Sequence, residues 1–204
     1  ALQKQAVARM TENGKQELID RPLVSAIAEG LIADDLAALR DYFDSLNTAT
    51  PEILWSPAPA DLDEEVLRIL LTYWTALPRG QSLPLSSAVD PMNMKAALGY
   101  IMLLDVMDDG WDFRYRVYGS SIARRSGFDA TGKLVSALPV APMALFFIAT
   151  YRACLARMAS MFARHVPPLE IQVVSWDRLI LPLEDGTGRI DRLLVGNVPG
   201  SWRA

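Results

Sequence analysis

The sequence predicts an α+β domain, with a five-stranded antiparallel sheet, helices on one face of it, and a helical extension at the N-terminus. Short strand-like runs occur in blocks that tight turns connect, two before a long helical run and three after it. This order favours an antiparallel sheet over a parallel one. A chain of 204 residues, 51% hydrophobic and 22% charged, is typical of globular proteins and long enough for about one domain with a sizeable core.

The N-terminal extension is predicted to be helical, with its second helix starting at Asp20. Asp20 ahead of Pro22 indicates a helix start, and apolar residues then recur at helical spacing. The helical segment after Asp34 and Asp35 carries an apolar stripe of Leu36, Leu39, Tyr42, Phe43 and Leu46. The proline-rich segment 51–59 breaks this pattern and indicates a linker. We therefore expect a helical extension with its linker at 1–60 and a domain at 61–204.

The predicted sheet begins with a hairpin. Asp109-Gly110 is a strong two-residue turn signal, because a type I′ turn needs positive φ at both positions. A turn there fixes the register and places Asp105 opposite Arg114. The five expected strands are residues 100–107, 111–118, 169–175, 178–184 and 189–196.

The long helix is predicted over Ala141–His165, a run without glycine or proline after Pro142. Its cations, Arg157 and Arg164, lie toward the C-terminal end, where they suit the helix dipole.

Cations alternate with aromatic residues from Phe113 onward, a pattern that would suit nucleic acid. Strand periodicity explains the same residues, because Arg114 and Arg116 would share one face with Tyr118. A cross-strand pair of Asp105 and Arg114 is the interpretation we prefer. With a net charge of −4 and a pI near 5.0, nucleic acid is an unlikely partner.

Catalytic and metal-binding patterns are largely absent from the sequence. His165 is the only histidine and Cys154 is the only cysteine. Because they are eleven residues apart on one predicted helix, they would not form a catalytic dyad. Their scarcity also argues against a zinc site, and no phosphate-binding glycine motif occurs. No apolar run reaches the roughly 18 residues that cross a bilayer. We expect a cytoplasmic protein with no membrane association, no catalytic residues and no metal.

Several ordered motifs between Leu70 and Gly196 resemble a proteobacterial family of short, stand-alone PAS-type proteins. The segment LLTYWTALPRGQSLPLSSAVDP contains Tyr-Trp, Gly, Leu-Pro and Asp-Pro, and IMLLDV is an apolar strand. The segment FRYRVYGSSIARRSGFDATGK contains Tyr-Arg and Thr-Gly, and DRLILPLEDGTGRIDRLLVG contains Leu-Pro-Leu. Ser120-Ser121 replaces the family's usual Gly-Thr. The resemblance implies the PAS sensory fold, in which a ligand lies between the inner sheet face and the helices.

Such a cavity would have the long helix as one wall, with methionines that adapt to irregular shapes. The residues expected to bind a ligand are Tyr118, Met143, Phe147, Thr150, Cys154 and Met158. A plain core stripe explains the same spacing. The usual PAS cofactors do not fit: Cys154 is not in a flavin-adduct motif, and His165, just before Pro167, is a poor haem ligand. The sequence thus supports none of haem, flavin or metal.

These expectations favour a non-enzymatic PAS-type sensory or adaptor protein that binds a small molecule or a protein partner and signals by association. The alternative is a small enzyme acting in the PAS-like cavity. The helices within residues 22–46 are expected to form a homodimer, or else to cover the sheet of their own chain, because their apolar stripe needs burial.

Overall fold

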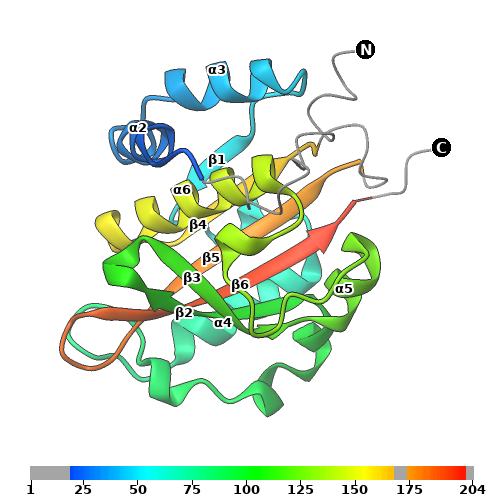
Figure 1. Ribbon diagram of the computed structural model, residues 1–204. Helices are drawn as coiled ribbons and strands as arrows, with labels where there is room; N and C mark the ends of the chain where they lie inside the picture. Colours follow the sequence, from blue (N-terminus) through cyan, green and yellow to red (C-terminus); the bar gives the residue numbers. More distant parts are fainter. Residues whose placement is uncertain (1–18, 168–173, 201–204) are drawn as a thin grey trace.

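One antiparallel sheet of six strands, in the order β1-β4-β5-β6-β2-β3, forms the centre of the computed structural model, which describes residues 19–167 and 174–200 (Figure 1). The strands are β1 (Glu52–Trp55), β2 (Ile101–Met107), β3 (Asp112–Tyr118), β4 (Met161–His165), β5 (Trp176–Glu184) and β6 (Ile190–Pro199). The predicted α+β class with an antiparallel sheet is confirmed, with one strand more than expected. Of the strand expected at 169–175, residues 169–173 lie outside the described part of the chain.

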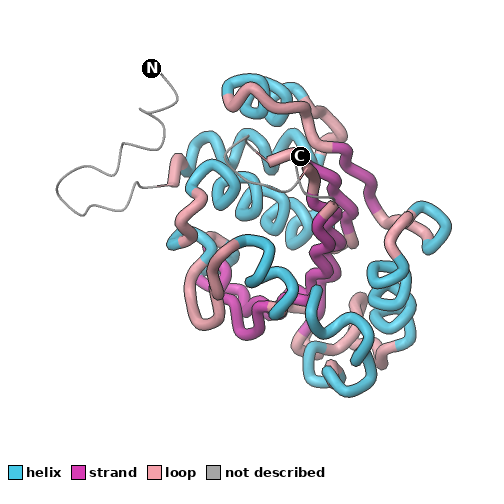
Figure 2. The backbone as a smooth tube through the Cα atoms, turned by 90° about the vertical axis from the view of Figure 1, so that its right-hand side faces the viewer, coloured by secondary structure: helices cyan, strands magenta, loops and turns pink. Residues whose placement is uncertain are grey.

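Helices lie on both faces of this sheet, not on one. The α-helices are α2 (Arg21–Ile32), α3 (Ala37–Ser45), α4 (Glu65–Ala76), α5 (Ser120–Ser126) and α6 (Ala141–Arg157). The short 3₁₀ helices are η1 (Pro59–Asp61), η2 (Ser86–Ala88), η3 (Pro91–Tyr100), η4 (Asp108–Gly110) and η5 (Val135–Ala137). Helix α6 crosses the inner face, with α2 and α3 as a further layer above it, whereas α4 and η3 cover the outer face (Figures 1 and 2).

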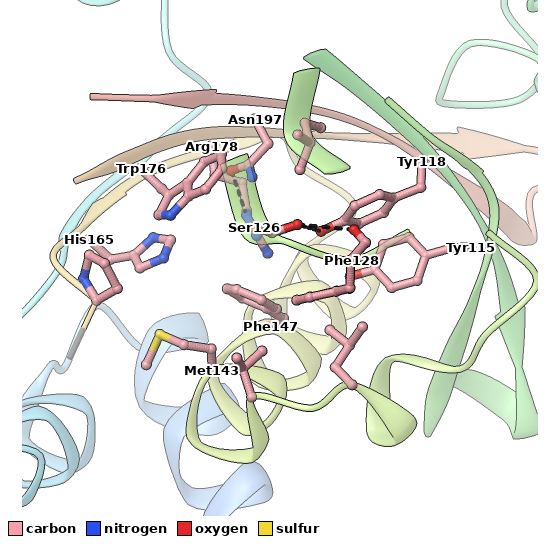
Figure 3. A pocket seen from close by; sticks show the side chains of 14 residues that line it. Tyr115, Tyr118, Ser126, Phe128, Met143, Phe147, His165, Trp176, Arg178 and Asn197 are labelled. Carbon is pink, nitrogen blue, oxygen red and sulfur yellow. Dashed lines mark hydrogen bonds between the residues drawn. The ribbon is translucent and has the colours of Figure 1, made fainter. Parts of the chain in front are cut away.

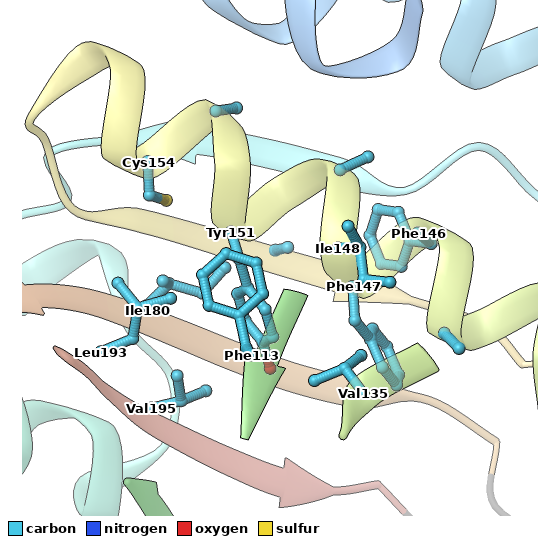
Figure 4. Packing of buried hydrophobic residues seen from close by; sticks show 14 of the residues in the cluster. Phe113, Val135, Phe146, Phe147, Ile148, Tyr151, Cys154, Ile180, Leu193 and Val195 are labelled. Carbon is cyan, nitrogen blue, oxygen red and sulfur yellow. The ribbon is translucent and has the colours of Figure 1, made fainter. Parts of the chain in front are cut away.

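Strand alternation divides the core into two clusters. On the inner face, Ile180, Leu193 and Val195 pack beneath α6, where the rings of Tyr151 and Phe113 meet edge to face with centroids 5.1 Å apart (Figure 4). On the outer face, the intervening leucines of β5 and β6 pack against α4. This helix approaches β6 closely at Gly196, where a Cβ would lie 2.6 Å from a methyl group of Leu67.

The long helix is shorter than the sequence predicts. It ends at Arg157 because Met158 adopts a left-handed conformation (φ 51°) and its N–H donates to the carbonyl of Leu155. Residues 161–165, predicted as the last turns of the helix, form β4, which pairs with β5. Neither glycine nor proline marks this stop, so the apolar run reads as one continuous helix.

The N-terminal extension is part of the same core as the rest of the chain. Strand β1, in the segment expected to be a linker, pairs with β4. The buried apolar residues of α2 and α3 are Val24, Ile27, Ala28, Leu31, Leu39 and Phe43. They pack against the side of α6 that faces away from the sheet, and the rings of Phe43 and Phe146 meet with centroids 5.1 Å apart. The buried part of the stripe expected to form a homodimer is therefore covered within its own chain.

The β2–β3 hairpin has the predicted register. Asp109 and Gly110 both have positive φ, 53° and 87°, and Asp105 is the cross-strand partner of Arg114. A bulge follows, because the register shifts between Leu103 and Leu104 and leaves Arg116 without a partner of its own. The prediction that Tyr118 shares a face with Arg114 is therefore wrong. The bulge turns Tyr118 inward, where its ring centroid lies 5.1 Å from that of Tyr115.

Candidate ligand-binding cavity

A cavity of about 70 Å³ lies between the inner face of the sheet and the N-terminal half of α6 (Figure 3). Its apolar wall comes from α6 and from the segments that flank α5 and η5, and includes Met143, Phe147, Phe128 and Leu138. The opposite wall is the sheet, which contributes polar side chains. The cavity is thus amphipathic, apolar toward the helix and polar toward β4, β5 and β6.

The pairing of three strands positions the polar wall. His165 on β4 is the cross-strand partner of Trp176 on β5, and Arg178 is the partner of Asn197 on β6, so these side chains share the inner face (Figure 3). Asp177, between Trp176 and Arg178, points to the outer face by strand alternation.

Arg178 is the most unusual residue in this wall, because its guanidinium is buried, with only 2% of the residue exposed. Its Nε donates to the Asn197 side-chain oxygen at 3.3 Å and its Nη1 donates to the Tyr151 hydroxyl at 3.1 Å. The guanidinium carbon lies 3.5 Å from the centroid of the Phe147 ring. No carboxylate in the described part of the chain forms an ion pair with it.

His165 lies beside Arg178 and is equally buried. Its ring contacts the edges of Phe146 and Phe147, and its Nδ1 has no hydrogen-bond partner among the residues that the structure describes. Burial, and secondarily the charge of Arg178, lower the pKa of His165 well below its ordinary value, so the imidazole is neutral at pH 7.

Tyrosines form the end of the cavity near β3. Tyr118 stacks on Phe128, and its hydroxyl lies 3.4 Å from the Ser126 hydroxyl. Burial raises the pKa values of Tyr118 and of Tyr115 behind it, so both phenols are neutral at pH 7. The described lining therefore contains one cation, Arg178, and no anion.

A family model for the PAS domain matches residues 62–196 of this sequence. The chain belongs to the PAS domain family. No curated protein matches it. A solved structure of an RNA-binding light-oxygen-voltage receptor is similar to this PAS protein at 11% sequence identity, with a TM-score of 0.43. The match covers 88% of the PAS protein and 59% of that receptor chain.

The motifs that resemble PAS-type proteins lie mainly on the outer face of this PAS domain. The Tyr73 hydroxyl bonds with the backbone of Asp90, accepting from its N–H at 2.7 Å, and the Trp74 indole donates to the Pro182 carbonyl at 2.9 Å. The Tyr-Trp, Asp-Pro and Leu-Pro-Leu motifs thus join α4 to the start of η3 and to β5. They stabilise the scaffold and do not line the cavity.

Half of the residues predicted to bind a ligand line the cavity of the PAS domain, namely Tyr118, Met143 and Phe147. Thr150 is buried, with its hydroxyl donating to the Phe147 carbonyl at 2.9 Å, and Cys154 is buried in the core. Met158 is 40% exposed at the end of α6. These three do not line the cavity, because the helical stripe defines a face of α6 but not how far along it the cavity extends.

Sequence reasoning missed the polar wall. Its signal is nonetheless in the sequence: in DRLILPL, alternation from Ile180 places Arg178 on the same inner face. His165 was not assigned to this wall, because residues 161–165 were predicted as the end of the long helix and not as β4.

With its side chains in these positions, the cavity of about 70 Å³ is too small for the ring system of a porphyrin or a flavin. No group of three or more His, Cys, Asp or Glu side chains that could hold a metal occurs within residues 19–167 and 174–200. Over the same residues, no helix has both the length and the apolar character needed to span a membrane.

Proposed function

We propose that this chain is a non-enzymatic sensory domain that binds a small molecule in the cavity between α6 and the sheet. The observation that supports this function is the buried polar wall, in which Arg178 has no acidic partner and His165 Nδ1 has no hydrogen-bond partner among the described residues. Cavities that stay empty in protein interiors are apolar, whereas buried polar groups are normally satisfied by protein, water or ligand.

Helix α6 offers a route from this cavity to the surface. Met143 and Phe147 face the cavity, while Phe146 on the neighbouring face contacts Phe43 of α3. The Tyr42 hydroxyl also donates to the Pro142 carbonyl at 2.7 Å, in the first turn of α6. A ligand that favours one position of this turn would also change its contact with α3, and so bias the layer formed by α2 and α3.

We infer that the signal is read by association of a partner with this layer. A second copy of the chain is one such partner, although burial of the apolar stripe within the chain removes the main reason to expect it. Nucleic acid has little support as a partner, because Arg116, Arg157 and Arg164 each pair with an aspartate of the chain.

An enzyme acting in the cavity has less support than a sensor. Burial raises the pKa of the Cys154 thiol, which suppresses the thiolate form that acts as a nucleophile, and this residue does not line the cavity.

Native mass spectrometry of the freshly purified full chain tests the proposed function. We expect a species heavier than the apoprotein by the mass of a small molecule, which is lost on denaturation. Hydrogen exchange of α2, α3 and α6 with and without that molecule tests the route to the surface. The proposed function fails if the protein retains nothing and no member of a small-metabolite library alters its melting temperature.

A further inference from the structure

The charge of Arg178 is not neutralised by the part of the chain that the structure describes. A guanidinium has five N–H donors, and two hydrogen bonds, to Asn197 and Tyr151, account for only part of them. Both partners are neutral, and the residue is 2% exposed. A buried charge is costly unless it is paired, so an unpaired cation in a cavity wall indicates that something else meets it there.

The neighbouring groups within the described part of the chain do not supply a negative charge. Burial raises the pKa values of Tyr115, Tyr118 and Tyr151, which keeps these phenols protonated. Asp177, adjacent in sequence, accepts two bonds from Arg164, at 2.8 and 2.7 Å. The acid next to Arg178 on β5 is therefore already paired with another arginine.

We propose that the cavity binds a small organic carboxylate whose head group pairs with Arg178. This inference rests on the proposed function and names the ligand class. A carboxylate matches the planar guanidinium and accepts two parallel hydrogen bonds from it. The apolar part of such a ligand would lie toward Met143, Leu138 and Phe147.

Charge and size both favour a short monocarboxylate. The described lining has one cation, whereas a phosphate dianion would require a second. A volume of about 70 Å³ has room for roughly five to seven water molecules, because one water needs about 10–15 Å³. This space suits a carboxylic acid of a few heavy atoms.

The test compares butyrate with butyramide, which is similar in shape but uncharged, on the full chain. Calorimetric titration and thermal melting are measured at constant ionic strength, with sodium chloride as the reference salt. We expect butyrate to bind and to raise the melting temperature, because a ligand specific for the folded state stabilises it. Butyramide should bind at least about tenfold more weakly, the minimum expected for losing a charge-assisted hydrogen bond.

Arg178→Gln is the matched variant, with Arg40→Gln on the exposed surface of α3 as its control. We expect Arg178→Gln to lower butyrate affinity by at least about tenfold and Arg40→Gln to leave it unchanged. If Arg178→Gln does not fold, Arg178→Lys, which keeps the charge but not the planar fork, should still weaken butyrate more than butyramide.

The inference would be overturned by equal binding of butyrate and butyramide, by an unchanged butyrate affinity in Arg178→Gln, or by no binding of any of acetate, propionate and butyrate. Saturation by chloride alone would also overturn it, since the site would then bind an inorganic anion. In each case, a neutral molecule retained in the native mass spectrum would leave the proposed function standing.

Discussion

Arg178 on β5 lies over the ring of Phe147 on α6, with its guanidinium carbon 3.5 Å from the ring centroid. A strand and a helix on opposite sides of the cavity are thus joined by a buried cation–π contact. Such contacts contribute about 2 kcal/mol or more when they are desolvated.

A double-mutant cycle of Phe147→Leu and Arg178→Gln should give a coupling free energy of about 1–2 kcal/mol in urea unfolding, because leucine keeps apolar bulk but has no ring face. The matched cycle pairs Arg178→Gln with Phe146→Leu, whose ring contacts Phe43 and has no cation over its face among residues 19–167 and 174–200. Its coupling should be near zero, and similar couplings in both cycles would contradict a specific contact.

Asp105 forms its ion pair with Arg116, not with its cross-strand partner Arg114. The Arg116 Nε lies 3.0 Å from the Asp105 carboxylate, and Arg192 approaches the same oxygen at 3.5 Å. Arg116→Ala should lower the free energy of unfolding by about 0.2–1 kcal/mol, as for other partly exposed pairs, and Arg114→Ala by less. Chemical denaturation of both variants measures the difference, and a larger effect of Arg114→Ala would refute the assignment.

The sequence predicted the parts of the fold that local rules determine. Asp109-Gly110 gave the hairpin register because a two-residue turn with positive φ has few alternatives. It could not reveal the end of α6, because Met158 adopts a left-handed conformation without being a residue that favours it. Strand β1 was missed because its four residues, between prolines, form a strand only when β4 is there to pair with them.

The cavity was predicted less well for a related reason. Periodicity identified Met143 and Phe147 on α6, but the polar wall depends on three strands that come together from distant parts of the chain. Tyr118 was named as a ligand contact, yet only the bulge at Arg116, which tertiary pairing creates, turns it inward. Side chains that meet through long-range pairing leave little local signal in one sequence.

His165 should make stability depend on pH in a narrow window. It is the sole histidine, and its folded pKa lies well below the ordinary value of 6.5, first because of burial and then because of Arg178. As pH falls below about 6.5, the unfolded state gains a proton that the folded state does not bind. Stability is therefore full above this pH and declines below it, by up to about 1.4 kcal/mol per pH unit.

Urea unfolding between pH 7.5 and 5.5 measures this slope. His165→Phe should abolish it, because phenylalanine retains the ring contacts with Phe146 and Phe147 but does not titrate. Carboxyl groups contribute mainly at lower pH. A variant that keeps the wild-type slope would show that the histidine is not responsible.

The extension should be required for the folded state of the rest of the chain. A variant that begins at Asp61 lacks β1, α2 and α3, and so exposes the outer side of α6 and the edge of β4. Burial of each large apolar side chain contributes about 1.5–3 kcal/mol, so we expect this variant to aggregate or to lose cooperative unfolding in light-scattering and urea experiments. A monomeric truncation with the urea midpoint of the full chain would contradict the shared core.

Point variants separate this effect from the loss of chain length. Phe43→Ala, at a fully buried position against Phe146, should cost about 3–5 kcal/mol, whereas Asp44→Ala, on the exposed side of the same helix, should change stability by less than about 0.5 kcal/mol. If both variants unfold like the wild type, α3 does not pack on α6 in solution. A loss confined to Phe43→Ala, with no change in molar mass by light scattering, would show that the stripe is covered within one chain and not by a second copy.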